Sequence, residues 1–332
     1  MNNTFNAYWV EEAIDGTFKS EVKEVPFSVL PENDALIKVH YSSLNYKDGL
    51  SASGNKGVTK SYPFIPGVDA AGEIVEDRSG SFSIGEKIIV TGYDLGMNTS
   101  GGFGEYIRVP SEWIVPLPKN LSLLQSMIIG TAGYTAAYGV KRLQRELITP
   151  ESGKVLVTGA TGGVGSMAVY LLSKLGYSVI AATGKMHQKK LLHLLGASKV
   201  IHRDELYPKK KSLLHSGTYT AAIDTVGGKM LEAIIPQMKQ DGAIACCGNI
   251  LGHELNTNIY PFILRGVSLL GIDSGITKMP FRLKVWEMLS SFDFDFPNSA
   301  YKIVSLQELD DEIQTILAGN QVGRVVLKHD NI

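Results

Sequence analysis

The stretch KVLVTGATGGVGSMAVYLLSKLGYSVIAATGK, residues 154–185, constrains the fold more than any other part of the chain. It predicts an apolar strand, a glycine-rich turn, a helix and a second strand in direct succession. Free N–H groups and the helix dipole favour an anion at the start of such a helix. Ala160, Gly162 and Gly165 occupy the three positions of the G-x-G-x-x-G pattern of dinucleotide-binding turns. The alternative is a tight turn in an unrelated α/β protein.

The same alternation of strand and helix continues to Asp273. Apolar strands are expected at 154–159, 178–183, 198–203, 219–224, 242–248 and 267–273. Continuous apolar strands separated by helices predict a parallel sheet covered on both faces. Six of them match the doubly wound Rossmann fold.

The segments on either side of this region have a different residue pattern. Up to about Pro118 the chain reads as short β-strands broken by Gly and Pro, which predicts a mostly antiparallel, barrel-like unit. After Ser274 a helix, a strand, a helix and a final strand are expected to rejoin that unit. We therefore predict one domain from residues 1–126 and 275–332, and a second from residues 127–274.

Composition narrows the class of protein. The 332 residues carry a net charge of −1, which argues against general nucleic-acid binding. No apolar run approaches the length of a membrane span, and the start lacks the pattern of a signal peptide. The only cysteines are the neighbours Cys246 and Cys247, which make a poor structural disulfide. A reducing cytosol is the simplest location.

The end of the second strand selects the cofactor. An NAD site usually places Asp or Glu there to bind the ribose 2′-OH, but this strand ends in Thr183, Gly184 and Lys185, and no acid occurs between Glu151 and Asp204. A 2′-phosphate would be attracted by Lys185, and Arg203 could add a second positive charge. The pattern predicts NADPH. The alternative is that the lysines here only form a solvated helix start.

The whole chain resembles zinc-free medium-chain dehydrogenases/reductases, and within them the putative quinone oxidoreductases that include acrylyl-CoA reductases. The landmarks are SSLNYKDGL, PFIPGVDAAG, IIGTAGYTA, VTGATGGVGS, AIDTVGG, PFILRGVSLLGIDS and GRVVLK. The resemblance implies a GroES-like catalytic domain beside the Rossmann domain and NADPH-dependent reduction of a carbonyl-activated double bond. Relatives join two copies through the last strand of the parallel sheet, so we expect a homodimer.

Zinc is not expected. The N-terminal half has no Cys and only one His, His40, and Val68 and Asp69 stand where zinc relatives carry a Gly-His-Glu stretch. Catalytic zinc needs converging Cys, His or carboxylate ligands, and this pattern does not supply them.

The resemblance also assigns site residues. It places Asn45, Tyr46 and Asp48 beside the nicotinamide, with Asp48 orienting its neighbours or relaying a proton; a helix N-cap at Asn45 and a buried Tyr46 is the alternative. The strand-end position of Gly248, Asn249 and Ile250 suggests that they line the nicotinamide side. The resemblance adds Phe262, Ile263, Ser274, Asn320 and Arg324; Arg324 would meet a phosphate or pair with a surface acid. The full set of predicted cofactor contacts is Tyr46, Thr161, Gly162, Gly163, Val164, Gly165, Thr183, Gly184, Lys185, Arg203, Gly248, Asn249, Ile250, Phe262, Ile263, Ser274, Asn320 and Arg324.

Three functions stay open on this basis. The first is NADPH-dependent reduction of a short enoyl-CoA such as acrylyl-CoA, and the second is quinone reduction with the same cofactor. A third is a cofactor-binding regulatory or structural protein without turnover. The expected partner is a small-molecule substrate.

Overall fold

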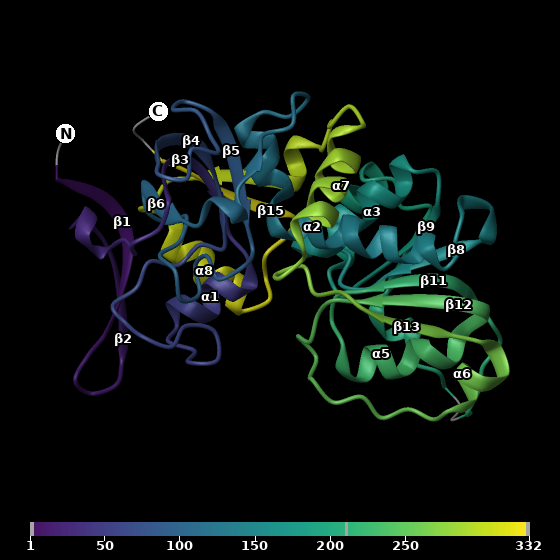
Figure 1. Ribbon diagram of the computed structural model, residues 1–332. Coiled ribbons are helices and arrows are strands. Elements are labelled where there is room, and N and C mark those ends of the chain that lie inside the picture. Colours follow the sequence, from purple (N-terminus) through teal and green to yellow (C-terminus); the bar gives the residue numbers. More distant parts are fainter. Residues whose placement is uncertain (1–2, 210–211, 330–332) are drawn as a thin grey trace. The chain divides into compact units, whose positions relative to one another are not determined.

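The computed structural model describes residues 3–209 and 212–329 (Figure 1). The chain divides into two compact units. Unit 1 contains the residues up to Thr131, Gly275–Asp295 and the residues from Tyr301 onward, and unit 2 contains Ala132–Ser274 and Phe296–Ala300. The sequence placed the first boundary five residues earlier, at 126, and did not anticipate the short return at 296–300.

Unit 2 is built on a six-stranded parallel sheet. Its strands are β8 (Lys154–Val157), β9 (Ser178–Thr183), β10 (Lys199–His202), β11 (Tyr219–Asp224), β12 (Met238–Cys246) and β13 (Ser268–Gly271). They pair in the order β10-β9-β8-β11-β12-β13, and every pair is parallel. This is the doubly wound order, with its reversal between β8 and β11, so the Rossmann prediction is confirmed.

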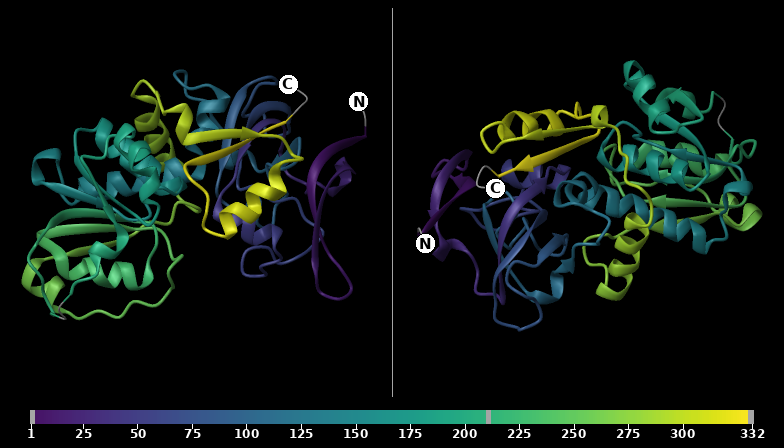
Figure 2. Two further views of the ribbon diagram at one scale, coloured as in Figure 1. Left: turned by 180° about the vertical axis from the view of Figure 1, so that it is seen from behind. Right: turned by 90° about the horizontal axis from the view of Figure 1, so that it is seen from above.

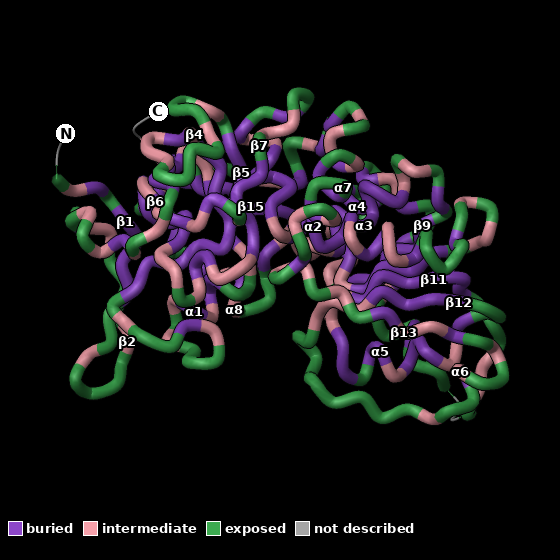
Figure 3. Tube along the Cα trace, in the orientation of Figure 1, coloured by how far each residue is buried: buried purple, intermediate pink, exposed green. Residues whose placement is uncertain are grey.

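Helices cover both faces of this sheet. They are α3 (Gly163–Lys174), α4 (Lys189–Leu194), α5 (Gly228–Ile234) and α6 (Tyr260–Arg265). Figure 1 shows α3 and α5 on opposite sides of the sheet. The central strands β8 and β11 are accordingly buried except at Lys154, and the tube labelled β11 is purple in Figure 3. Apolar strands without alternation are what a sheet covered on both faces requires.

Unit 1 is mostly antiparallel. Its strands are β1 (Thr4–Glu12), β2 (Phe18–Pro26), β3 (Ala35–Ser43), β4 (Asp69–Asp77), β5 (Lys87–Thr91), β6 (Tyr106–Val109), β7 (Val115–Pro116), β14 (Tyr301–Val304) and β15 (Arg324–Lys328). The main sheet runs β14-β15-β3-β4-β5-β7, with β6 also paired to β3. Along β3, Ile37 and Val39 face one apolar cluster and Leu36 faces another. Because successive side chains of a strand point to opposite faces, β3 contributes to both apolar clusters.

The C-terminal tail belongs to unit 1. The strand β15 pairs antiparallel with β3, and Figure 2 shows it against the purple N-terminal strands. The helix α8 (Leu309–Leu317) packs on α1 (Tyr46–Ala52) through a shared apolar cluster. The helix α7 (Met279–Ser290) is anchored by buried Arg282, whose Nη1 donates to Thr91 O at 2.8 Å. The predicted return of the tail to the first unit is therefore seen directly in the strand pairing.

The long helix α2 (Leu123–Arg145) contains one break. Gly130 has φ 49° and ψ −161°, which is not helical. The boundary between the two units, after Thr131, follows this break by one residue.

Candidate functional site

The glycine turn of unit 2 lies at the carboxyl end of the sheet. It connects β8 to α3, whose first residue is Gly163 and whose N-cap is Gly162. No acidic side chain lies in the first turn of α3. Thr161, Val164 and Gly165 complete the turn and the helix start. The free N–H groups of this helix end are therefore available to an anion without a competing carboxylate.

Two glycines test whether a pyrophosphate fits here. A Cβ added at Gly165 would lie 2.2 Å from Gly159 O, so the helix packs on the turn only because this side chain is absent. A Cβ at Gly162 would meet nothing closer than Gly159 O at 3.4 Å. The protein's own packing therefore does not demand glycine at 162, and the space on that side is open to a ligand. The arrangement fits the phosphate-binding role.

The end of β9 is tied to this turn. Thr161 Oγ1 and Thr183 Oγ1 lie 3.0 Å apart, and both residues are buried. The Lys185 N–H donates to Thr183 Oγ1 at 3.0 Å. Lys185 itself is half-buried, and this burial lowers the pKa of its ammonium group. A partly desolvated cation gains more from a phosphate than a fully hydrated one does.

Arg203 lies beside the same strand end. A Cβ added at Gly184 would come within 3.1 Å of Arg203 Nε, so the guanidinium group lies over the glycine. The side chain is 56% exposed, and its carboxylate neighbour Asp204 is 3.9 Å away. The structure thus brings Thr183, Lys185 and Arg203 together, as the sequence predicted.

The ends of the last two strands hold four further predicted residues. Gly248, Asn249 and Ile250 follow β12, and Ile250 is 58% exposed. Ser274 follows β13, and its Oγ accepts a hydrogen bond from Thr135 Oγ1 at 2.7 Å. All four lie at the carboxyl ends of their strands, where ligands bind in sheets of this kind.

Phe262 and Ile263 lie in α6, and their contact with the cofactor stays a prediction. They belong to α6, which ends three residues before β13 begins, so α6 lies at the amino end of the parallel strands. Phe262 packs on the apolar core beneath the sheet, and Ile263 is 64% exposed.

In unit 1, Asn45 is the N-cap of α1 and Tyr46 is its first residue. Tyr46 is 36% exposed, so the alternative of a buried tyrosine does not hold. Both amide hydrogens of Asn45 Nδ2 are used, on Asp69 Oδ2 at 2.8 Å and on Ser43 O at 3.2 Å. Its amide nitrogen therefore has no hydrogen left for a substrate.

Asp48 is fully buried inside unit 1. Its Oδ2 accepts the Asn45 N–H at 2.7 Å, and its Oδ1 accepts the Val68 N–H at 2.8 Å. Burial, followed by the nearby charge of Asp69, raises the pKa of Asp48 to about 7. Both oxygens therefore accept backbone N–H groups, one at the N-cap of α1 and one just before β4, while a role of Asp48 beside the nicotinamide stays a prediction.

Arg324 is also inside unit 1. It is 1% exposed, and its guanidinium group donates to Ile128 O, Leu44 O and Ser43 Oγ. The alternative of a surface ion pair is therefore wrong, and protein oxygens take the place of the expected phosphate. Asn320 is exposed, and its N–H donates to Thr315 O at the end of α8.

Two buried carboxylates were not predicted as site residues. Asp69 lies at the start of β4 and contacts Asn45. Asp224 ends β11; its Oδ1 accepts from Thr158 Oγ1 at 2.6 Å and its Oδ2 from the Gly227 N–H at 2.9 Å. Burial raises the pKa of Asp224. Asp224 is tied to the glycine turn, because Thr158 begins that turn. The sequence did offer a signal for it, namely an acid at the end of the fourth parallel strand.

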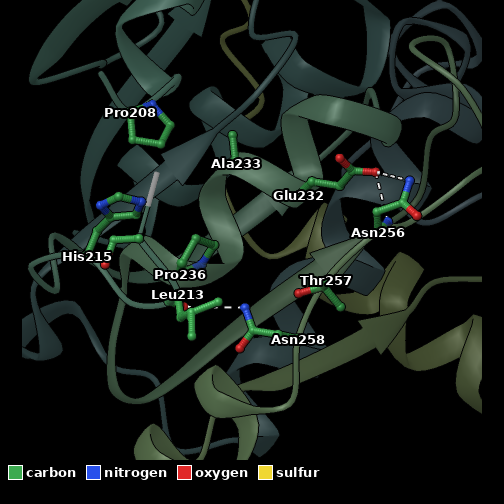
Figure 4. Close-up of a pocket in the computed structure, with 10 residues that line it drawn as sticks. Pro208, Leu213, His215, Glu232, Ala233, Pro236, Asn256, Thr257 and Asn258 are labelled. Atoms are coloured by element: carbon green, nitrogen blue, oxygen red, sulfur yellow. Dashed lines mark hydrogen bonds between the residues drawn. The ribbon is translucent and has the colours of Figure 1, made fainter. Parts of the chain in front are cut away.

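A shallow hollow of about 390 Å³ occurs elsewhere on unit 2 (Figure 4). It is lined by segments that lead into the amino ends of strands, including His215 and Pro236. Glu232 Oε1 on its wall accepts from both nitrogens of Asn256, and the figure shows these bonds. The hollow thus lies at the opposite edge from the glycine turn.

Comparisons with known proteins show to which family the chain belongs. Residues 31–119 match the family model described as alcohol dehydrogenase GroES-like domain, and residues 163–291 match the model described as zinc-binding dehydrogenase. A Bacillus subtilis (strain 168) protein named "Putative quinone oxidoreductase YhfP" is 43% identical over 332 residues, 99% of this chain and 100% of its own. The chain belongs to the medium-chain dehydrogenase/reductase family of oxidoreductases.

Further members of the family carry other names and bind different forms of the cofactor. Acrylyl-CoA reductase AcuI of Ruegeria pomeroyi is 38% identical, over 97% of this chain and 98% of its own. The crystal structure of Escherichia coli K-12 YhdH with bound NADPH has a TM-score of 0.92 at 40% identity, covering 97% of this chain and 99% of that one. The structure of Bacillus subtilis yhfP with NAD bound has a TM-score of 0.93 at 42% identity, covering 98% and 99%.

One of the matching family models is described as zinc-binding, so possible metal ligands bear on the chemistry of this chain. Among residues 3–209 and 212–329, no group of three or more His, Cys, Asp or Glu side chains is placed to hold a metal ion. Burial raises the pKa of Cys246 to about 11 and that of Cys247 to about 12, so both are thiols at neutral pH. Within the same residues, no helix is long and apolar enough to cross a membrane.

Proposed function

We propose that this chain is an NADPH-dependent reductase that transfers hydride to a carbon–carbon double bond conjugated to a carbonyl, with a short enoyl-CoA such as acrylyl-CoA as the acceptor. The observation that carries the proposal is the end of β9. There Lys185 and Arg203 lie beside Thr183, and no acid occupies the position that binds a ribose 2′-OH in NAD enzymes. The name of the Ruegeria pomeroyi relative and the NADPH in Escherichia coli YhdH support the acceptor and the cofactor.

The residues of unit 2 would hold the cofactor. The N–H groups of Gly163, Val164 and Gly165 would bind the pyrophosphate, because they form a helix start without an acid, whereas the Gly162 N–H already donates to Gly159 O. Lys185, Thr183 and Arg203 would bind the 2′-phosphate. When bound, NADPH supplies a hydride from its nicotinamide ring.

The residues of unit 1 would act on the acceptor. The hydride adds to the carbon β to the carbonyl, the carbonyl oxygen gains negative charge, and a proton is then added at the α-carbon. A hydrogen-bond donor at that oxygen would stabilise the developing charge. Since both amide hydrogens of Asn45 are already used, we assign this role to the hydroxyl of Tyr46.

A quinone is the second candidate acceptor, favoured by the name of the Bacillus subtilis relative. The two acceptors differ in the phosphates that only CoA carries. Four cations could meet these phosphates: Lys47, Lys56, Lys60 and Arg265. Of these, Arg265 is committed to the carbonyls of Pro236 and Met238, and Lys56 pairs with Glu12. The remaining two, Lys47 and Lys60, are exposed on unit 1.

The experiment is an NADPH-oxidation screen of short enoyl-CoAs and quinones, scored by kcat/KM, with and without a chelator. A kcat/KM for acrylyl-CoA at least about tenfold above that of any quinone supports the proposal, since tenfold corresponds to about 1.4 kcal/mol in the transition state. The reverse ratio supports the quinone. If NADPH were oxidised with none of the acceptors, the result would support the protein without turnover. Loss of activity on chelation would contradict the metal-free assignment.

A further inference from the structure

Asp69 is the centre of a buried polar cluster in unit 1, which we call the Asp69 cluster; its members are Ser43, Asn45, Asp69, Thr131 and Arg324. The Asp69 side chain has no exposed surface. Its Oδ2 accepts hydrogen bonds from Ser43 Oγ at 2.5 Å, Asn45 Nδ2 at 2.8 Å and the Thr131 N–H at 2.9 Å. Its Oδ1 accepts from Thr131 Oγ1 at 2.6 Å. One carboxylate therefore joins β3, the N-cap of α1 and the helix α2.

Ser43 connects this carboxylate to a buried cation. Ser43 Oγ donates its single hydrogen to Asp69 and accepts from Arg324 Nη2 at 2.8 Å. The anion and the cation are thus bridged by one hydroxyl group inside the protein. Removing either charge would leave the other buried with less compensation, which is unfavourable; for Arg324, only Asp48 would remain as a nearby acid.

The same two charges stand at the break in α2. The Asp69 carboxylate takes the N–H of Thr131 just after the break, and Arg324 Nε donates to Ile128 O just before it, at 3.0 Å. A negative charge is favourable at the start of a helix and a positive charge at its end, and the two parts of α2 meet these charges at the break. A Cβ at Gly130 would lie 2.4 Å from Ser43 Oγ and 2.7 Å from Asp69 Oδ2. The cluster therefore admits only glycine at the break.

Asn45 is held between the two charges. Its Nδ2 faces the carboxylate of Asp69, and its Oδ1 faces Arg324 Nη1 at 3.5 Å. This fixes which way the amide points, because the nitrogen lies toward the anion and the oxygen toward the cation. The residue that follows, Tyr46, starts α1 and is partly exposed.

We propose that Asp69 is a positioning residue for Tyr46: through the Asp69 cluster it fixes Asn45 and the first turn of α1, and so the place of the Tyr46 hydroxyl. The effect on turnover rests on the proposed function, in which Tyr46 contacts the acceptor. The effect on Asn45 does not rest on it and can be measured separately.

The principal variant is Asp69→Asn. The asparagine side chain has one acceptor oxygen where Asp69 has two. Its NH2 group would face hydrogen-bond donors, so either the bond from Asn45 or the bonds from Thr131 are lost. A displacement of about 1 Å in a positioned group can cost about 100-fold in rate. We expect kcat to fall about 10- to 100-fold, while the dissociation constant for NADPH changes less than about threefold.

The matched control is Asp77→Asn at the other end of β4. Asp77 also accepts several hydrogen bonds, from Ser79, Phe82 and Ser111, but it does not contact α1. Ser43→Ala is the milder companion, because it removes the bridge and keeps both charges. It should fold if Asp69→Asn does not, and it should lower kcat in the same direction.

A double variant separates positioning from stability. Asp69→Asn combined with Arg324→Gln removes both buried charges, so it should recover part of the resistance to urea that the single variant loses. It should not recover kcat, because Asn45 still lacks its anchor. Recovery of kcat together with urea resistance would overturn the proposal.

The closing experiment compares wild type, the three cluster variants and Asp77→Asn by three measurements: the side-chain NH2 resonance of Asn45 in a 15N-labelled sample, the NADPH dissociation constant, and kcat. We expect the Asn45 resonance to move in every cluster variant and to stay in Asp77→Asn. An unmoved resonance, or a folded cluster variant with unchanged kcat, would overturn the positioning role. If wild type turned over no acceptor while the resonance moved as expected, the proposed function would fail and the hold of Asp69 on Asn45 would stand.

Discussion

The hydroxyl groups of Thr161 and Thr183 lie 3.0 Å apart and join the glycine turn to the end of the neighbouring strand. The first residue belongs to the turn that would hold a pyrophosphate. The second begins the segment that would hold a 2′-phosphate, and Lys185 donates its N–H back to it. Under the proposed function this contact would link the pyrophosphate site to the site that selects the cofactor, and we expect a change at Lys185 to affect cofactor choice most.

Lys185→Glu should move the cofactor preference toward NADH. Losing one charge-assisted hydrogen bond of about 1.5–3 kcal/mol weakens the NADPH interaction roughly ten- to hundredfold. NADH should hold or improve, because a carboxylate there can bind the 2′-OH. The measurement is kcat/KM for both cofactors at low salt. Lys189→Glu, exposed at the start of α4, is the control, and equal loss of both cofactors would indicate damage to the fold instead.

Tyr46→Phe should lower kcat more than it raises the KM for NADPH. The hydroxyl is proposed to contact charge that develops only in the transition state, and losing one such donor costs on the order of 100-fold at most. Steady-state kinetics with acrylyl-CoA make the comparison, with exposed Tyr207→Phe in unit 2 as the control. A kcat equal to that of wild type would leave Tyr46 with a packing role only.

Asp48 should make the free energy of unfolding fall with rising pH. Its pKa is about 7 in the folded chain, with Asp69 and Arg324 as the charged groups that face it, and about 3.9 when unfolded. Between these values the unfolded chain loses the proton and the folded chain keeps it, so stability declines from about pH 4 to about pH 7 and then levels off. Urea unfolding at several pH values measures this free energy. It should decline less with pH in Asp48→Asn than in wild type, and the altered hydrogen bonds of the variant should only shift its whole curve by a constant amount. Parallel curves would show that Asp48 does not titrate in this range.

A homodimer should form through β13, which is the edge strand of the parallel sheet. Its unpaired N–H and C=O groups invite a second strand, and the neighbouring α6 exposes Ile263 and Leu264. Light scattering at micromolar concentration should give twice the mass of one chain. Ile263→Glu with Leu264→Glu should give the single mass, whereas Ile303→Glu, on the edge strand β14 of the other sheet, should not. A monomeric wild type would mean that the edge of β13 is covered in another way.

Local patterns predicted the parallel sheet, the glycine turn and the cation at Lys185, because each depends on residues close together in sequence. The Asp69 cluster could not be found in this way. It joins Ser43, Asp69 and Arg324 from distant strands, and the break at Gly130 interrupts a stretch whose composition is helical throughout. The cofactor contacts of Phe262 and Ile263 were assigned by resemblance alone, and they stay predictions.

The central claim is tested most directly by following the hydride itself. Wild-type protein is supplied with acrylyl-CoA and NADPH that carries deuterium at C4 of the nicotinamide, prepared separately in each of its two stereochemical forms. The account predicts that one form, and only one, delivers a single deuterium to the carbon β to the carbonyl of propionyl-CoA, with solvent hydrogen added at the α-carbon. Propionyl-CoA without deuterium from either form, or no propionyl-CoA at all, would contradict it.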